Sequence, residues 1–131
     1  MIEQINLIIG EMMQDGLYKD LTYKIIGAAM EVHNTLGPGF LEKVYQNALE
    51  QELFYRKVGF SSQTSYIVKY KNKKAGIYRP DLTAENIIII EIKAVSDLNL
   101  NLAAAQLISY LSATKIQGGI INKFWPEEIR I

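Results

Sequence analysis

The chain has 131 residues, of which 49% are hydrophobic, and it carries 14 basic and 14 acidic side chains and no cysteine. This length and apolar content suit one globular domain, so we expect residues 1–131 to form a single unit. The missing cysteines exclude disulfides and thiolate metal sites, and the zero net charge gives no support for binding nucleic acid through overall charge.

No segment has the pattern of a membrane span. An uninterrupted apolar run such as residues 87–90 is far shorter than the roughly 20 residues that cross a bilayer. The N-terminus lacks the basic start of a signal peptide. We therefore expect a cytoplasmic protein that does not bind membranes.

Three helices are predicted in the first half of the chain. Residues 1–16 have apolar side chains at helical spacing, and we interpret positions 1–19 as an appended helical segment that precedes a core of about residues 20–131. A second helix begins at Asp20 and ends at the glycines of "GPG", residues 37–39. The third covers residues 40–56.

The third helix carries an acid at the edge of its apolar stripe. With Leu41 at zero and about 100° per residue, the apolar side chains span about −60° to 120°, and Glu42 falls at about 100°. Solubility alone does not require an acid there. Glu52 lies even deeper in the stripe, so position on the helix does not by itself define a site.

Extended structure follows residue 59. The patterns of residues 64–71, 75–83 and 87–95 predict three strands in an antiparallel meander, with Pro80 at a bulge or an unpaired edge. The third strand has apolar residues at both odd and even positions, so both of its faces are apolar and we expect both to be covered.

A helix over residues 99–114 and a strand over residues 118–122 complete the pattern. The helical crossover predicts that this last strand joins the sheet in parallel. The order of elements is that of an α/β (α+β) fold around one central mixed sheet flanked by helices.

Basic charge is concentrated in residues 61–79, which contain no acid. The basic residues are Lys69, Lys71, Lys73, Lys74 and Arg79. Lysines that protect an exposed strand edge and lysines that contact phosphate explain this segment equally well.

Four charged residues interrupt the apolar strands. Strand parity places Arg79 and Asp81 on one face of their strand, and Glu91 and Lys93 on one face of the next. An odd-numbered loop centred on residue 85 or 86 would set Asp81 opposite or nearly opposite Glu91. A two-residue loop would send them to opposite faces.

Two carboxylates that meet on a partly buried face need a proton or a cation between them. Mg²⁺ fits, because it binds one or two carboxylates and keeps waters for a phosphate-bearing substrate. Lys93 beside the ion could orient or deprotonate a water, or stabilise charge on the phosphate. An ordinary ion-pair network among the same four residues is the alternative.

These residues resemble a known signature. Pro80-Asp81, followed after nine residues by Glu91-Ile92-Lys93, is similar to the motif of the PD-(D/E)XK nucleases. Upstream, "GFLEKVY" resembles the motif of the GxxExxY family, matched by Gly39, Glu42 and Tyr45. "YRPDL", "EIKAV", "AQLISYL" and "GGIIN" follow in that family's order, so the resemblance covers about residues 20–131. It implies a restriction-endonuclease-like core of helix, three strands, helix and strand.

The resemblance implies roles for individual residues. Asp81 and Glu91 would hold the metal, with the Ile92 carbonyl as a further ligand, and Lys93 would be the catalytic lysine. Glu42 would approach the same metal from its helix. The cofactor would be Mg²⁺, with Mn²⁺ as an alternative.

The resemblance also implies auxiliary roles for three further residues. Gln106 and Tyr110 are similar to residues that some of these nucleases place beside the active site, although an ordinary packed helix face explains them equally well. Arg79 would contact phosphate or pair with Asp81. The C-terminal "INKFWPEEIRI" departs from the Asn-Phe-Gly turn that is frequent in the family.

The implied function is metal-dependent hydrolysis of phosphodiester bonds in nucleic acid, with DNA favoured, by a chain that could form homodimers through its N-terminal segment. The main alternative is a non-catalytic accessory module that keeps the fold and binds nucleic acid or a protein. A hydrolase of nucleotides or other phosphate esters would use the same residues.

Overall fold

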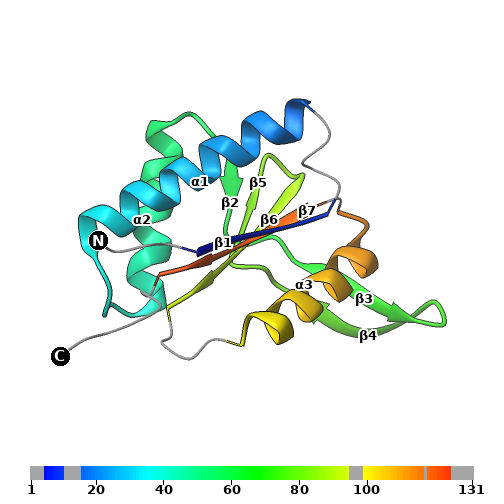
Figure 1. Cartoon of the computed structure of the whole chain (residues 1–131). Coiled ribbons are helices and arrows are strands. Elements are labelled where there is room, and N and C mark those ends of the chain that lie inside the picture. Colours follow the sequence, from blue (N-terminus) through cyan, green and yellow to red (C-terminus); the bar gives the residue numbers. More distant parts are fainter. Residues whose placement is uncertain (1–4, 11–15, 95–98, 117, 125–131) are drawn as a thin grey trace.

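The computed structural model describes residues 5–10, 16–94, 99–116 and 118–124, which form a mixed sheet between two helical layers (Figure 1). The elements in chain order are β1 (Ile5–Gly10), α1 (Gly16–Leu36), α2 (Glu42–Tyr55), β2 (Phe60–Ser61), β3 (Tyr66–Tyr70), β4 (Lys73–Tyr78), β5 (Leu82–Ala84), β6 (Ile88–Lys93), α3 (Leu100–Thr114) and β7 (Gly118–Lys123). None of the described helices is long and apolar enough to cross a bilayer.

The main sheet has five strands in the order β1-β7-β6-β5-β2, with β6 at its centre. Strands β6 and β7 run parallel, and the other described pairs in this sheet are antiparallel. Helix α3 connects β6 to β7. The sequence-based predictions of a mixed sheet and of a parallel last strand are therefore confirmed.

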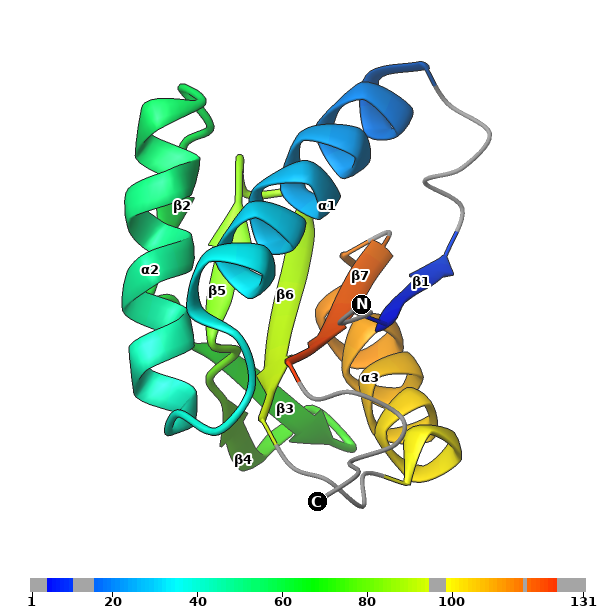
Figure 2. The same ribbon diagram turned by 60° about the vertical axis from the view of Figure 1, so that its left-hand side comes forward.

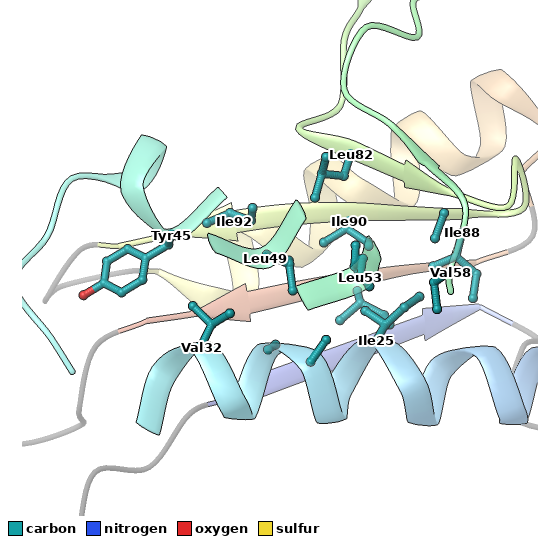
Figure 3. Packing of buried hydrophobic residues seen from close by; sticks show 14 of the residues in the cluster. Ile25, Val32, Tyr45, Leu49, Leu53, Val58, Leu82, Ile88, Ile90 and Ile92 are labelled. Atoms are coloured by element: carbon teal, nitrogen blue, oxygen red, sulfur yellow. The ribbon is translucent and has the colours of Figure 1, made fainter. Parts of the chain in front are cut away.

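The two faces of the sheet have different partners (Figure 2). Helices α1 and α2 cover the first face, where Ile88, Ile90 and Ile92 of β6 pack against both helices. Figure 3 shows this cluster, in which Leu49 and Leu53 of α2 lie over the β6 isoleucines.

Helix α3 covers the second face. A smaller cluster there contains Ile89 of β6, Ile121 of β7 and three α3 residues, Ala103, Leu107 and Leu111. Consecutive isoleucines of β6 are thus buried on opposite faces, as alternation along a strand requires. The prediction that this strand is covered on both faces is confirmed.

The N-terminal helix predicted over residues 1–16 is wrong. Residues 5–10 form strand β1, which pairs antiparallel with β7 from Ile5 opposite Lys123 to Gly10 opposite Gly118. Isoleucine-rich "INLIIG" is short enough to satisfy either a helical or an extended pattern, and the open edge of β7 supplies the backbone partners that decide between them. Residues 11–15 lie outside the described residues.

The predicted three-strand meander is also wrong in one respect. Residues 75–83 do not form one strand: β4 ends at Tyr78 and β5 begins at Leu82. Strands β3 and β4 form a separate two-stranded sheet, while β5 pairs with β6 in the main sheet. Pro80 lies in the break, where its missing N–H interrupts no ladder.

The second face of the sheet depends on a close approach of α3 to β7. A Cβ atom at Gly119 would lie 2.9 Å from Cδ2 and 3.0 Å from Cδ1 of Leu107, whose side chain is buried. Only a glycine lets the helix settle at this distance without displacing Leu107.

We expect Gly119→Ala to lower the free energy of unfolding by about 1 to 3 kcal/mol, because Leu107 must leave its position. In the double variant Gly119→Ala/Leu107→Ala, the loss should be smaller than the sum of the two single losses, since the new methyl group occupies vacated space. Urea denaturation measures the free energy of unfolding of the two single variants and of the double variant. The control is Gly76→Ala in β4, where an added Cβ meets nothing within 4 Å; equal losses at both glycines would contradict the packing argument.

Candidate active site

The register of β5 and β6 decides which side chains meet. Leu82, Thr83 and Ala84 pair with Ile90, Ile89 and Ile88, and the three residues between the strands form the turn. One further step of the same register sets Asp81 opposite Glu91. The odd-numbered loop predicted from parity is confirmed, and it is centred on residue 86.

Glu85 holds this turn in place. Glu85 and Asn86 have positive φ angles of 51° and 60°, a conformation that costs energy for residues other than glycine. Two hydrogen bonds stabilise this conformation. The backbone N–H of Glu85 donates to the Gly59 carbonyl (2.8 Å), and the N–H of Gly59 donates to Glu85 Oε1 (2.6 Å). This pair of bonds ties the turn to the segment before β2 and fixes the register.

The carboxylates of Asp81 and Glu91 each accept a hydrogen bond from the backbone of the opposite strand. The backbone N–H of Asp81 donates to Glu91 Oε1 (3.0 Å), and the N–H of Ile92 donates to Asp81 Oδ2 (2.7 Å). Each carboxylate therefore binds the opposite strand where the backbone ladder has ended. Each also retains a second oxygen that can accept from another group.

A small cavity of about 30 Å³ opens beside Glu91. Glu91 and Lys93 line it from β6, and Gln106 and Tyr110 line it from α3. The structure thus brings together two signature residues and the two helical residues that the sequence analysis placed beside them. Gln106 and Tyr110 lie on the exposed side of α3, so both can reach a bound molecule.

The Glu91 carboxylate is in an unfavourable place for a negative charge. Burial is the main cause, and the charge of Asp81 adds to it; together they raise the pKa of Glu91 from 4.5 to about 7. The Asp81 N–H and the charge of Lys93 act in the opposite direction. A cation beside the pair would relieve both the burial cost and the repulsion.

Tyr78 is a residue of this site that the sequence analysis missed. Its ring is buried, stacks on Tyr110 at a centroid distance of 3.8 Å, and lines the same cavity. Burial and the nearby Glu91 charge strongly raise the pKa of its hydroxyl, which therefore stays protonated. The hydroxyl lies near Glu91 but makes no hydrogen bond of good geometry with any described residue.

In one continuous strand, Tyr78 and Asp81 would point to opposite faces, because they are three residues apart. The chain breaks at Pro80 between β4 and β5, so this alternation does not carry over from Tyr78 to Asp81. The sequence signal for Tyr78 was its place at the end of an alternating strand directly before the signature. Lys123 was missed as well. It is buried on β7 as the register partner of Lys93.

No close ion pair joins the four charged residues Arg79, Asp81, Glu91 and Lys93 in the part of the chain that the structure describes. The salt bridge found within 4.0 Å among the described residues joins Arg56 to Glu52 of α2 at 2.9 Å. Both residues are distant in sequence from those that line the cavity. Arg79 is exposed and forms no such pair with Asp81. A contact of Arg79 with phosphate stays a prediction.

The loop before α2 presents Glu42 on the exposed first turn of this helix. Gly37 and Gly39 have positive φ angles of 72° and 107°, and the buried Tyr45 donates its hydroxyl hydrogen to the Gly37 carbonyl. The glycine and the tyrosine of the "GFLEKVY" stretch therefore build the loop, and Glu42 stays exposed.

Glu42 is not gathered with the other two acids. In the ranges that the structure describes, no three acidic or histidine side chains lie close enough together to hold a metal ion. Gln46, one turn further along α2, does donate to the Asp81 carbonyl (3.2 Å). The side of α2 that carries Glu42 and Gln46 thus reaches the backbone of the signature aspartate.

A comparison with protein-family models matches residues 19–130 to the PD-(D/E)XK nuclease superfamily. The chain belongs to the PD-(D/E)XK nuclease superfamily. No curated protein and no solved structure matches it. The superfamily resemblance of the sequence is thereby confirmed, and the mixed sheet with its flanking helices agrees with the restriction-endonuclease-like fold. The roles of the individual PD-(D/E)XK residues stay predictions.

The raised pKa of Glu91 predicts a titration near pH 7 in metal-free buffer, against 4.5 for an ordinary glutamate. The native protein then holds this proton more tightly than the unfolded chain, so this group makes folding less favourable as the pH rises from about 4.5 to 7. Asp81→Asn should lower the midpoint because one cause of the shift is removed.

Carbon-13 NMR of the Glu91 side-chain carboxyl measures this midpoint directly. Asp20→Asn, an exposed carboxylate on α1, is the matched control and should leave the midpoint unchanged. A wild-type midpoint near 4.5 would show that the carboxylate is well solvated.

Proposed function

We propose that this protein hydrolyses phosphodiester bonds in nucleic acid with the help of a divalent metal ion, Mg²⁺ in the first place and Mn²⁺ as the alternative. The observation that supports this most is the opposed pair Asp81 and Glu91, with Glu91 held at a pKa of about 7 beside Lys93. DNA in the cytoplasm is the substrate we favour over RNA, and a homodimer is a further expectation.

The residues fit a hard divalent cation. Asp81 and Glu91 each use one carboxylate oxygen for a backbone N–H and keep the other. The reciprocal bonds hold both groups at the same level of the sheet, and the two charges repel each other across a partly buried face. Oxygen ligands of this kind are those that Mg²⁺ prefers. The Ile92 carbonyl and Glu42 are proposed as further ligands.

When bound, the metal would stabilise the negative charge that builds on the phosphate and would lower the pKa of a water. Lys93 would orient this water or take its proton, or stabilise charge on the phosphate from the cavity wall. The protonated hydroxyl of Tyr78 supplies a donor beside Glu91. Gln106 and Tyr110 would contact the substrate from α3.

Asp81→Asn should lower the rate of metal-dependent DNA cleavage by on the order of 100-fold or more, because a metal ligand loses its charge while the side-chain volume stays the same. Gel assays with plasmid and single-stranded DNA in Mg²⁺ or Mn²⁺ measure the rate, and thermal unfolding checks the fold. Asp20→Asn should cleave like the wild type. Equal cleavage by Asp81→Asn and wild type would assign the activity to a contaminant.

Calorimetric titration with Mn²⁺ separates the hydrolase from a non-catalytic accessory module. We expect saturable binding to the wild type and its loss in Glu91→Ala. Glu42→Gln should weaken binding less than Glu91→Ala does, since Glu42 lies on an exposed helical turn apart from the other two acids. Asp20→Asn again serves as the control. A wild type without saturable binding would favour the accessory module.

A further inference from the structure

The two-stranded sheet of β3 and β4 carries a cluster of positive charge. This hairpin, residues 66–78 and here named the lysine hairpin, runs beside α3 with its turn pointing away from the five-stranded sheet (Figure 1). Its exposed lysines are Lys69, Lys71, Lys73 and Lys74. The rest of the chain must balance this charge, because the whole sequence has a net charge of zero.

We propose that the lysine hairpin binds the phosphate backbone of a nucleic acid strand and holds the part of that strand that extends beyond the active site. The identity of the bound polymer rests on the proposed function. Four observations support the surface itself.

The first observation is an unfavourable charge arrangement. Lys69 lies directly opposite Lys74 across the hairpin, and Lys73 is opposite Tyr70. Like charges at directly opposed positions destabilise a strand pair, whereas a single lysine suffices to protect an edge. No acid lies between residues 61 and 80 to compensate. A phosphate between the two ammonium groups would remove the repulsion.

The second observation is a well-defined turn that carries this charge. Lys71 and Asn72 both have positive φ angles, 49° and 66°, as a two-residue type I′ turn requires. A bulge between Val68 and Lys69 increases the local twist. The lysines therefore stand on a defined hairpin and not on an irregular loop.

The third observation is an exposed aromatic ring beside Lys71 and opposite Lys73. The side chain of Tyr70 is 67% exposed, and Nζ of Lys71 lies 5.4 Å from its ring centroid. Aromatic rings interleaved with ammonium groups are typical of surfaces on which bases stack while cations follow the backbone.

The fourth observation is continuity with the active site. Tyr66 and Val68 pack against the cluster under α3, and Tyr78 at the end of β4 lines the cavity beside Glu91. From Tyr78 to Lys73 the strand extends about 17 Å at roughly 3.3 Å per residue. At the roughly 3.4 Å per nucleotide of a strand stacked as in B-DNA, the lysines would meet phosphates about five nucleotides from the cavity, and fewer in a more extended single strand.

The test compares two triple variants with the same change in charge. Lys69→Gln/Lys73→Gln/Lys74→Gln alters the hairpin and leaves Lys71 in its turn. The matched control is Lys19→Gln/Lys24→Gln/Lys57→Gln, three exposed lysines in or after the helices of the opposite face. Fluorescence anisotropy with labelled 24-nucleotide DNA, single-stranded and duplex, in EDTA between 50 and 200 mM salt measures affinity.

We expect the hairpin variant to bind single-stranded DNA at least tenfold more weakly than the control variant. The slope of log K against log salt should fall by about 2, since each lost phosphate contact contributes roughly 0.7. Equal affinities and equal slopes for the two variants would overturn the proposal. So would a wild type that binds neither form of DNA.

The measurement of DNA affinity does not depend on whether the protein is catalytically active. Mn²⁺ binding should be unchanged in the hairpin variant, which separates loss of the surface from loss of the metal site. If the wild type cleaves nothing but the hairpin variant alone loses affinity, the proposed function fails and the binding surface stands. If cleavage is metal-dependent and both variants bind equally, the proposed function stands and this inference fails.

Discussion

The pairing register of β5 with β6 is the constraint on which the rest of this structure depends. A slip by one residue would turn Ile88, Ile90 and Ile92 away from α1 and α2 and would bury Glu91 and Lys93 in the larger core. The reciprocal bonds between Glu85 and Gly59 prevent this slip at one end of the strand pair. At the other end, Asp81 and Glu91 bind each other's strands through their carboxylates.

These two carboxylates therefore serve the fold and the candidate chemistry together. Their hydrogen bonds continue the ladder past the end of β5, and the same arrangement sets two like charges face to face where solvent is scarce. The sheet tolerates this because α3 and the β3–β4 hairpin cover the second face only in part and leave a water-sized cavity beside Glu91. Close packing is incomplete beside Glu91, at the candidate site.

Much of this arrangement could be predicted from the sequence, because it follows from local periodicity. The helices α1, α2 and α3, the doubly covered β6 and the parallel β7 all have clear patterns. Alternation along two strands predicted Asp81 opposite Glu91 for an odd-numbered loop, and the loop length itself was decided by the structure. The sequence placed Glu42 on this helix as well, although its exposure was decided by the loop that Tyr45 anchors.

The features that were missed depend on contacts between distant segments. Strand β1 is extended because the edge of β7 is free to pair with it, and no local pattern contains that fact. Tyr78 enters the site because the chain changes sheets at Pro80 and so changes the face on which the next side chain lies. The close contact of Gly119 with Leu107 likewise exists only once α3 has crossed over the sheet.

The pairing of β1 with β7 has a consequence for synthesis. Ile5 pairs with Lys123, so β1 is made well before its partner β7. At about 5 to 20 residues per second, the ribosome needs on the order of ten seconds to bridge that gap. During this time the apolar segment "INLIIG" has no strand partner of its own. The nascent chain therefore carries an unpaired β-forming segment until β7 has been made, and pairing with β7 covers that edge.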